Sequence, residues 1–553
     1  MIRPTFLSTT VLNKEVGFFQ LNSVKHNPII RCFSSANDNL NDQPRKVQIS
    51  FMTDVEGDAV YFNRFVEQSK ILDFDTDGTI HFIHNPDNAP NQRDLQTMFV
   101  YGGDSVDKGG SDLYVVQQLI SLRERYGPER VHFVLGNRDI NKMRITQELG
   151  SIIHFEKKDE KTDNIPSHKG VWWLKGRNRI GDPDSTDSSH FVSTKAGDRL
   201  KWMLANTMGS PDAFEYRRLE LIKEQLSKDD SSTERNEIMI SDDDVVRSYI
   251  QSCRPEGLMG KYLDYGSLIV KIGKVLFMHG GLPISEDLLQ DQEKLQEEDM
   301  EKYNHPYWNE STYPLPWLTS TNDKSILTEK SLNSESIHEN DTNMWVKKLS
   351  MFHQNEIKLW KSSFSTKADK ENQSQIWATK GGYMNSQNGT ALMQYGMGFT
   401  PDRKKNPTVV YESWASNGMP KILSPPISPL FSRPQQYLKL VQDFFMVSDI
   451  DLIVTGHQPH GDLPMPMKIP YSLDRSNGTS ALSSKCGWLM SCDTSFSGDT
   501  QWINTRLSNV GKGEALSGRG DVAVRYELLL LNSLSALCKD ISNSIVLLIY
   551  LME

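Results

Sequence analysis

Five side chains that can bind a metal ion stand where short apolar segments of the sequence end, and most lie beside a glycine. They are Asp54, Asp104, Asn137, His279 and His457. Carboxylate oxygens, an amide oxygen and imidazole nitrogens suit Mn, Fe or Zn rather than a soft thiolate site. Glycine permits the sharp turn and close approach that such a cluster needs. One aspartate is weak evidence, but five donors in this arrangement predict a metal centre.

One chemistry that such a centre supports is attack of water on a phosphate group. Two divalent ions about 3.5–4 Å apart clamp a phosphate, stabilise its entering and leaving oxygens, and generate hydroxide near neutral pH. A pair of divalent ions (Mn, Fe or Zn) is therefore the cofactor predicted for a centre built from these donors.

Strand and helix patterns alternate along the segments that hold these donors. Ala59 to Lys70 carries apolar side chains at helical spacing, and a second helix follows residue 112. Repeated strand–loop–helix units indicate an α/β sheet, in which sites lie beyond the carboxyl ends of the strands. The predicted strands cover residues 47–54, 98–101, 131–135, 268–279 (with a hairpin turn at 271–274), 450–455, 487–492 and 522–530.

Five segments resemble, in order, the motifs of calcineurin-like metallophosphoesterases, nearest the phosphoprotein phosphatase and diadenosine polyphosphate hydrolase branch. They are Asp54-Val55-Glu56-Gly57-Asp58, Gly103-Asp104-Ser105-Val106-Asp107-Lys108-Gly109, Gly136-Asn137-Arg138-Asp139, His279-Gly280-Gly281-Leu282 and Gly456-His457. The second is the most specific, because Asp-x-Val-Asp-Lys/Arg-Gly is long and constrained. The likeness covers residues 47–145, 266–284 and 448–494. It implies a four-layer α/β/β/α sandwich of two mixed sheets flanked by helices.

The resemblance also implies a role for each metal ligand. Asp104 bridges both ions, and Asp54 binds the first ion together with it. Asn137, His279 and His457 bind the second ion.

Two further positions match the family's phosphate and proton-transfer residues. Lys108 stands where the family has a phosphate-binding arginine. Asp107 stands where an acid orients the general-acid histidine.

The chain departs from the family pattern at two positions. Glu56 replaces a metal-binding histidine, and a carboxylate in its place still ligates a hard ion but adds negative charge. Arg138 replaces the histidine that gives a proton to the leaving oxygen, which an arginine cannot do because it stays protonated. Arg138 is instead predicted to bind phosphate through two parallel hydrogen bonds. His460 is a candidate for the missing acid or for an extra ligand to the first ion.

Plainer interpretations stand beside these. Asp54 alone also fits a helix N-cap near Ala59. Arg138 also fits a simple pair with Asp139 or Asp107. His460 also fits an ordinary loop residue, and Asp493 fits either a residue that holds a metal ligand or a strand-end cap.

The favoured function is hydrolysis of a phosphomonoester or phosphoanhydride in a phosphoprotein or a phosphorylated small molecule such as a nucleotide. The alternative is a catalytically weak or inactive protein of the same fold that serves as a binding scaffold. The lost histidine favours the scaffold, whereas the retained set of metal donors favours the enzyme.

Composition limits the remaining choices. The chain has 553 residues and a net charge of −10, which argues against nucleic acid as a partner. Five scattered cysteines form no CxxC pair, which argues against a disulfide framework or a zinc ribbon. The longest apolar run, 545–552, falls short of the roughly 20 residues that span a bilayer.

Three regions are predicted along the chain. Residues 1–46 are a leader and tail, basic, acid-poor and Ser-bearing up to about residue 36 like a mitochondrial or other organellar transit peptide, with a disordered tail of a cytoplasmic protein as the alternative. Residues 47–535 form the metallophosphoesterase domain, with two large insertions at about 155–262 and 284–405. Residues 536–553 are a C-terminal tail.

Overall fold

The computed structural model describes every predicted site residue except His460. His460 and residues 1–45 of the predicted leader lie outside the described residues, so the predictions for them stay predictions. The described residues are 46–83, 95–149, 196–228, 239–283, 335–364, 389–398, 408–411, 438, 441–442, 444–446, 448–457, 464–472, 484–493, 524–530 and 545–551.

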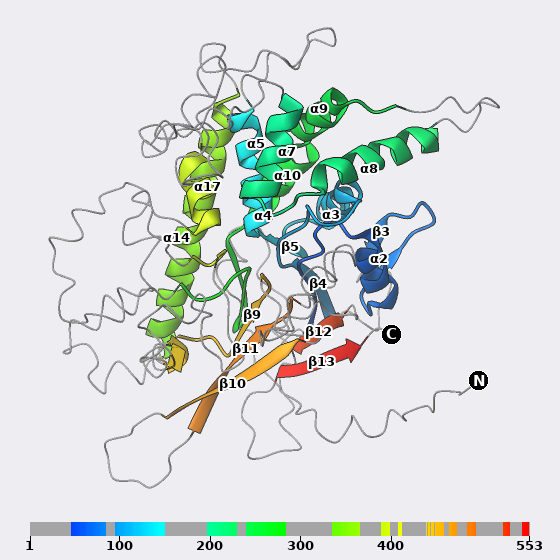
Figure 1. Ribbon diagram of the computed structural model, residues 1–553. Helices are drawn as coiled ribbons and strands as arrows, with labels where there is room; N and C mark the ends of the chain where they lie inside the picture. Colours follow the sequence, from blue (N-terminus) through cyan, green and yellow to red (C-terminus); the bar gives the residue numbers. More distant parts are fainter. Residues whose placement is uncertain are drawn as a thin grey trace, which may run out of the picture.

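Two sheets form the centre of the molecule (Figure 1). The first has the strand order β13-β12-β1-β4-β5-β6, and β1, β4, β5 and β6 run parallel. The second has the order β10-β11-β9-β8-β7, and β8, β9 and β11 run parallel. A separate hairpin joins β2 and β3. The strands are β1 (Lys46–Met52), β2 (Leu72–Phe74), β3 (Ile80–Phe82), β4 (Leu95–Tyr101), β5 (Val131–Val134), β6 (Gly266–Ser267), β7 (Ile269–Ile272), β8 (Val275–Met278), β9 (Leu452–Thr455), β10 (Met465–Ser472), β11 (Ser484–Ser491), β12 (Val524–Leu530) and β13 (Ile545–Leu551).

Side chains of the central strands alternate between two apolar clusters, as the period of a strand requires. In β4, Met98 and Val100 join the cluster shared by both sheets, whereas Phe99 joins the cluster that includes the helices. The shared cluster combines residues of β1, β4 and β5 with residues of β7, β8, β9 and β11. Phe51 of β1 stacks on Phe277 of β8 at 5.6 Å between ring centroids. The predicted α/β class is therefore confirmed.

Local signals set the limits of several helices. Asp58 accepts hydrogen bonds from Val60 N and Tyr61 N and caps α2, so Asp54 is not this cap. Gly127, at φ 78°, ends α3. Within the described part of the chain, no helix combines the length and apolar character that crossing a membrane requires. The helices are α2 (Ala59–Gln68), α3 (Asp112–Tyr126), α4 (Asn137–Asn141), α5 (Met143–Glu148), α7 (Ala196–Thr207), α8 (Ala213–Lys228), α9 (Asp242–Ser252), α10 (Leu258–Tyr265), α14 (Glu335–Ser362) and α17 (Thr390–Met397).

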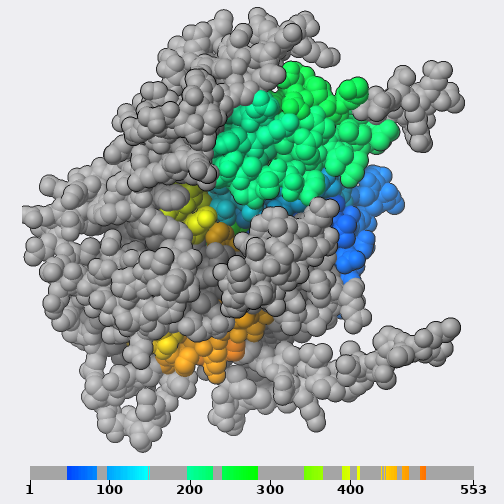
Figure 2. All heavy atoms as spheres, viewed as in Figure 1, coloured from blue at the N-terminus to red at the C-terminus, as the bar shows by residue number. Residues whose placement is uncertain are grey.

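Several helices fall inside the segments predicted as insertions. Helices α7 to α10 lie within or across the end of 155–262, and α14 and α17 lie within 284–405. Figure 1 shows α7 to α10 grouped together and α14 along another side of the molecule. In Figure 2 the green residues of α7 to α10 form one continuous surface region. Buried side chains such as Leu200, Tyr249 and Trp345 belong to the same apolar cluster as α2 and α3, so these helices extend the main core.

The C-terminal end of the sheet differs from the prediction. Residues 522–530 are predicted as the last strand, followed by a tail at 536–553. Instead, Ile545–Leu551 forms β13, which pairs antiparallel with β12. This run is rich in Ile, Val, Leu and Tyr, which fit a pleated sheet surface, and it covers the otherwise unpaired edge of β12. The strand predicted at 522–530 is therefore confirmed as β12, but it is not the last strand, and the prediction of a mere tail at 536–553 is wrong.

Glu356 of α14 predicts a pH dependence of stability. Its Oε2 accepts hydrogen bonds from Ala391 N (3.1 Å) and Leu392 N (3.4 Å) at the start of α17, and burial raises its pKa from 4.5 to about 7. The folded state then binds more protons than the unfolded state between these values. This stabilisation is fully present below about pH 4.5 and is lost as pH rises through about 7.

We expect Glu356→Gln to remove that contribution while keeping an oxygen acceptor. The measurement is urea unfolding of both proteins on either side of this pH window. The exposed Glu67→Gln is the control and should keep the pH dependence of the wild type. The same dependence in Glu356→Gln and the wild type would contradict this prediction.

Candidate metal and phosphate site

Donor side chains from both sheets meet beyond the carboxyl ends of parallel strands. Asp54 and Asp104 follow β1 and β4, and Asn137 follows β5 as the first residue of α4. His279 and His457 follow β8 and β9 of the other sheet. Asn137 Oδ1 lies 3.0 Å from His457 Nδ1 and 3.3 Å from His279 Nε2. Asp104 Oδ1 lies 3.4 Å from the same His279 nitrogen, so four donors from two sheets share one small volume.

Backbone strain is concentrated at these residues. Among the described non-glycine residues, those with positive φ are Asp54, Glu56, Asp104, Asp107 and His457. A left-handed conformation costs an ordinary residue about 1–2 kcal/mol and persists where the surrounding structure enforces it. All five belong to the predicted site, as expected where turns must aim side chains at a ligand.

Two glycines allow the strand ends to approach one another. Gly103 has φ 100°, and a Cβ on it would stand 2.6 Å from Gly136 N and 2.7 Å from His279 Nδ1. A Cβ on Gly456 would stand 2.3 Å from Asp54 Oδ2. Any side chain at either position would push the donors apart, which explains the glycines beside them.

His279 presents a nitrogen lone pair to the other donors. Its Nδ1 lies 2.8 Å from Gly102 O, and a carbonyl can only accept, so Nδ1 carries the proton. In the neutral ring Nε2 therefore faces Asp104 and Asn137 as an acceptor, as a metal ligand must. Burial alone lowers the pKa of His279, but Asp104 and Asp54 raise it to about 10. The two carboxylates thus stabilise a positive charge at Nε2, which either a proton or a bound metal ion supplies.

Asp54 is another buried carboxylate of the site, and its ionised form also requires a nearby positive charge. Its Oδ2 accepts from Thr53 Oγ1 at 2.6 Å, and both of its oxygens accept from His457 N at 3.1 and 3.2 Å. Burial and the nearby Asp493 carboxylate raise the pKa of Asp54 well above its usual value. The role predicted for Asp493 in holding a metal ligand stays a prediction.

Asp139 holds the turns of the site together, and the sequence analysis missed this role. Its Oδ2 accepts from Asp104 N (2.9 Å) and Gly136 N (2.8 Å). Its Oδ1 accepts from Ser105 N (2.8 Å) and Ser105 Oγ (2.6 Å). The available signal was an aspartate three residues after the glycine that precedes a helix, where a carboxylate stabilises the first turn. Arg138 does not pair with it in the way the plain alternative supposed.

The predicted phosphate-binding cations surround Glu56. Lys108 Nζ lies 2.7 Å and Arg138 Nε 2.8 Å from Glu56 Oε1. Arg138 Nε also lies 3.5 Å from Asp104 Oδ2. The Lys108 side chain is 23% exposed and the Arg138 side chain 13%, so Lys108 is the more accessible of the two to a ligand.

Asp107 has a partner that the sequence analysis did not anticipate. Lys142 Nζ lies 2.6 Å from each of the two Asp107 carboxylate oxygens, and both side chains are buried. Arg138 Nη1 lies 3.6 Å from Asp107 Oδ2. Asp107 therefore faces Arg138, while Lys142 balances its charge. Lys142 lies four residues after Arg138, about one helical turn on, so both cations reach Asp107 from the same side, but this spacing does not identify Asp107 as their partner.

Four donors fit a divalent ion, and we call them the four-donor site: Asp104, Asn137, His279 and His457. Within the described ranges, one set of three His, Cys, Asp or Glu side chains has ligand atoms within 4.8 Å of one another, and it is Asp104, His279 and His457. Oxygen and imidazole donors suit Mn, Fe or Zn. The motif resemblance also implies a site for a first ion next to Glu56. That site fits a metal ion less well, because the Glu56 carboxylate already pairs with Lys108 and Arg138.

No protein-family model and no curated protein matches the chain. Three solved structures of a cold-active protein tyrosine phosphatase, one described as from a psychrophile, Shewanella SP., are similar to it at 13% sequence identity. The likeness covers 93% or 94% of this chain and 83% or 86% of the other, with TM-scores of 0.26, 0.27 and 0.25. TM-scores this low support no argument about fold or function.

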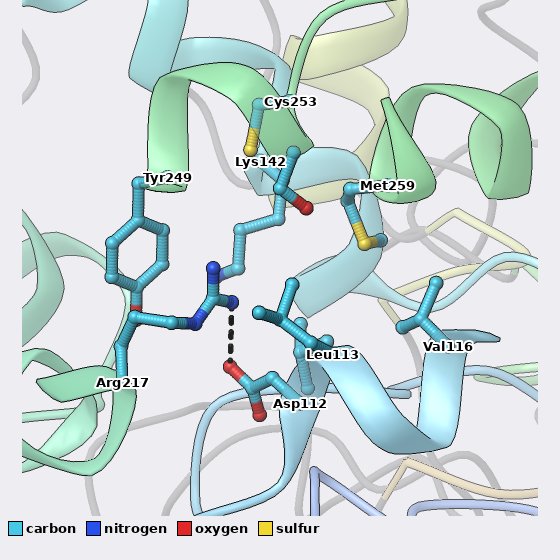
Figure 3. Close-up of a pocket in the computed structure, with 10 residues that line it drawn as sticks. Asp112, Leu113, Val116, Lys142, Arg217, Tyr249, Cys253 and Met259 are labelled. Carbon is cyan, nitrogen blue, oxygen red and sulfur yellow. Dashed lines mark hydrogen bonds and ion pairs between the residues drawn. The ribbon is translucent and has the colours of Figure 1, made fainter. Parts of the chain in front are cut away.

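Residues of α3, α8, α9 and α10 line a small pocket together with Lys142 (Figure 3). Its volume of about 10 Å³ leaves room for roughly one water. Figure 3 shows Arg217 of α8 pointing toward Asp112 of α3, and their closest atoms lie 3.5 Å apart. The other oxygen of Asp112 accepts from Asp107 N at 2.9 Å. Helix α8 is thus linked through Asp112 to the backbone of a site residue.

The turn between α7 and α8 anchors Arg138 directly. Arg138 Nη1 donates to Ser210 Oγ (2.8 Å) and to Met208 O (3.1 Å). We expect Ser210→Ala to destabilise the protein by about 1.5–3 kcal/mol, because it removes a buried hydrogen bond to a charged group. Urea unfolding measures this, and Ser227→Ala, which removes an exposed hydroxyl from the end of α8, is the control. An equal, small effect of both substitutions would contradict the prediction.

Proposed function

We propose that the protein is a metal-dependent phosphoesterase that hydrolyses a phosphomonoester or phosphoanhydride. The observation that carries the proposal is the convergence of the four-donor site with Asp54, Lys108 and Arg138 at the strand ends of two facing sheets. The resemblance of the five sequence motifs supports the same class. The proposal includes the four-layer α/β/β/α order, which the apolar cluster shared by the two sheets supports.

The residues of the site divide into those that hold an ion and those that meet a phosphate. The four-donor site would hold a divalent ion, which supplies Lewis-acid polarisation of a phosphoryl oxygen and activation of a water. Arg138, 3.5 Å from Asp104 Oδ2, places positive charge beside the four-donor site, and Lys108 adds a second cation at Glu56. Such charges stabilise phosphate oxygens as negative charge develops. Asp54 accepts from His457 N and so fixes one ligand of the ion.

Proton transfer to the leaving oxygen needs a group other than Arg138, which stays protonated. Asp107 orients Arg138, and its charge is balanced by Lys142. His460, three residues after His457, remains the candidate acid on sequence grounds. A substrate with a good leaving group requires no such acid, which favours phosphoanhydrides and activated esters.

The test uses the full chain stripped of metal with a chelator and then supplied with Mn²⁺, Fe²⁺, Zn²⁺ or Mg²⁺. Substrates are p-nitrophenyl phosphate, a nucleoside polyphosphate and a phosphopeptide. We expect metal-dependent turnover of at least one. Metal binding without turnover of any of these substrates would favour the alternative function, a binding scaffold whose site holds a metal ion. Failure to bind metal would reject the enzyme proposal outright.

A further inference from the structure

Glu56 stands where the resembled motif has a metal-binding histidine, and the backbone fixes it there. Its N–H donates to Asp104 O at 2.9 Å, and its carbonyl accepts from Lys108 N (2.8 Å) and Gly109 N (2.6 Å). The residue has φ 52° and is 3% exposed. Three backbone hydrogen bonds around a strained conformation determine where its side chain points.

The charge of Glu56 is balanced by side chains of this protein. Lys108 Nζ and Arg138 Nε lie 2.7 and 2.8 Å from the same oxygen, Oε1. Arg138 Nε lies at the same time 3.5 Å from Asp104 Oδ2. A guanidinium group therefore stands between two carboxylates that the first ion of a dinuclear centre would need.

The guanidinium is held in that place from its other side as well. Arg138 Nη1 donates to Ser210 Oγ at 2.8 Å, on the turn between α7 and α8. Its charge is permanent, since arginine is not deprotonated in proteins. A divalent ion between Glu56 and Asp104 would be repelled by this charge, and the repulsion is strong in a buried site of low dielectric.

We propose that the centre holds a single divalent ion, at the four-donor site, and that Arg138 supplies the positive charge that a second ion would otherwise supply. This inference rests on the proposed phosphoesterase function and departs from the two ions that the motif resemblance implies. In this arrangement Glu56 is a positioning residue for Lys108 and Arg138 rather than a metal ligand. Its carboxylate aims both cations at the phosphate.

The experiment measures metal content and metal environment together. The full chain is loaded with Mn²⁺, freed of excess ion, and analysed by elemental analysis and electron paramagnetic resonance. We expect one ion per chain and the hyperfine pattern of an isolated Mn²⁺. Glu56→Gln should keep the same metal content and spectrum, while KM for p-nitrophenyl phosphate rises about 10-fold, the size of one weakened hydrogen bond to a charged group.

A double variant, Glu56→His with Arg138→His, restores the family's residues and serves as the matched comparison. It should bind two ions and give the spectrum of an exchange-coupled pair. Two ions in the wild-type chain, or loss of an ion in Glu56→Gln, would overturn this inference while leaving the proposed function intact. A double variant that still binds one ion would also overturn it. A chain that binds no ion would overturn both proposals, and one bound ion without turnover would count against the function alone.

Discussion

Asp104→Asn is expected to lower kcat/KM for p-nitrophenyl phosphate by on the order of 10³-fold. This carboxylate is one of the four donors for the ion, and it also pairs with Arg138. Its Oδ1 lies 3.4 Å from His279 Nε2 and accepts from Arg138 N at 2.9 Å. Burial raises the pKa of Asp104, but His279 and Arg138 lower it well below its usual value, so the group is ionised at neutral pH. An asparagine has the same shape without the charge.

The loss should appear in metal content as well as in turnover. Bound Mn²⁺ per chain is expected to fall in Asp104→Asn under conditions that saturate the wild type. The exposed Asp73→Asn in β2 is the matched control and should leave both quantities unchanged. Retention of more than about a tenth of the wild-type kcat/KM would contradict this role for Asp104, because loss of a charged catalytic group costs far more than that.

Lys142→Met is expected to destabilise the fold by about 3–5 kcal/mol, because it leaves the buried Asp107 carboxylate without its closest cation. Lys142 is 1% exposed, and its Nζ lies 2.6 Å from both oxygens of Asp107. Methionine fills a similar volume, so packing changes little. Arg138 remains 3.6 Å away and offsets part of the charge, which places the expected loss near the lower end of this range.

The matched control is Lys361→Met, which breaks the exposed pair with Asp264 at 2.9 Å. A surface pair of this kind contributes about 0–1 kcal/mol. The free energy of unfolding in urea measures both losses. Adding Asp107→Asn to Lys142→Met should recover part of the stability, because no unpaired buried charge is left. Equal losses in Lys142→Met and Lys361→Met would contradict a buried ion pair at Asp107.

The ends of the strands that carry the metal donors could be predicted from the sequence, because the patterns that mark them are local. Short apolar runs predicted β4, β8 and β9, with Asp104 and His457 following a glycine and His279 following the β8 run directly. The parallel strands of the two sheets then bring these residues together, as the rule for open α/β sheets requires. The hairpin between β7 and β8 also lies where it was predicted, with its turn at Gly273, φ 58°.

The ion-pair and hydrogen-bond partners of the charged side chains could not be predicted from the sequence, because they depend on contacts between distant segments. Arg138 meets Ser210 across 72 positions of sequence. Asp107 meets Lys142 across 35. No local pattern distinguishes an arginine that binds phosphate from one that is held by Glu56 and a distant turn. The 28-residue helix α14 was not predicted either. Its amphipathic pattern is weak, and its apolar side chains are buried only by packing against distant parts of the chain.

The most direct test of a metal-dependent phosphoesterase is a titration of the metal-stripped full chain with Mn²⁺, with bound metal and turnover of p-nitrophenyl phosphate measured on the same samples. Our account predicts no turnover in the stripped chain and a rate that rises in proportion to bound metal until the four-donor site is full. Turnover that does not depend on bound metal, or a fully loaded chain that hydrolyses none of the phosphate esters offered, would contradict it.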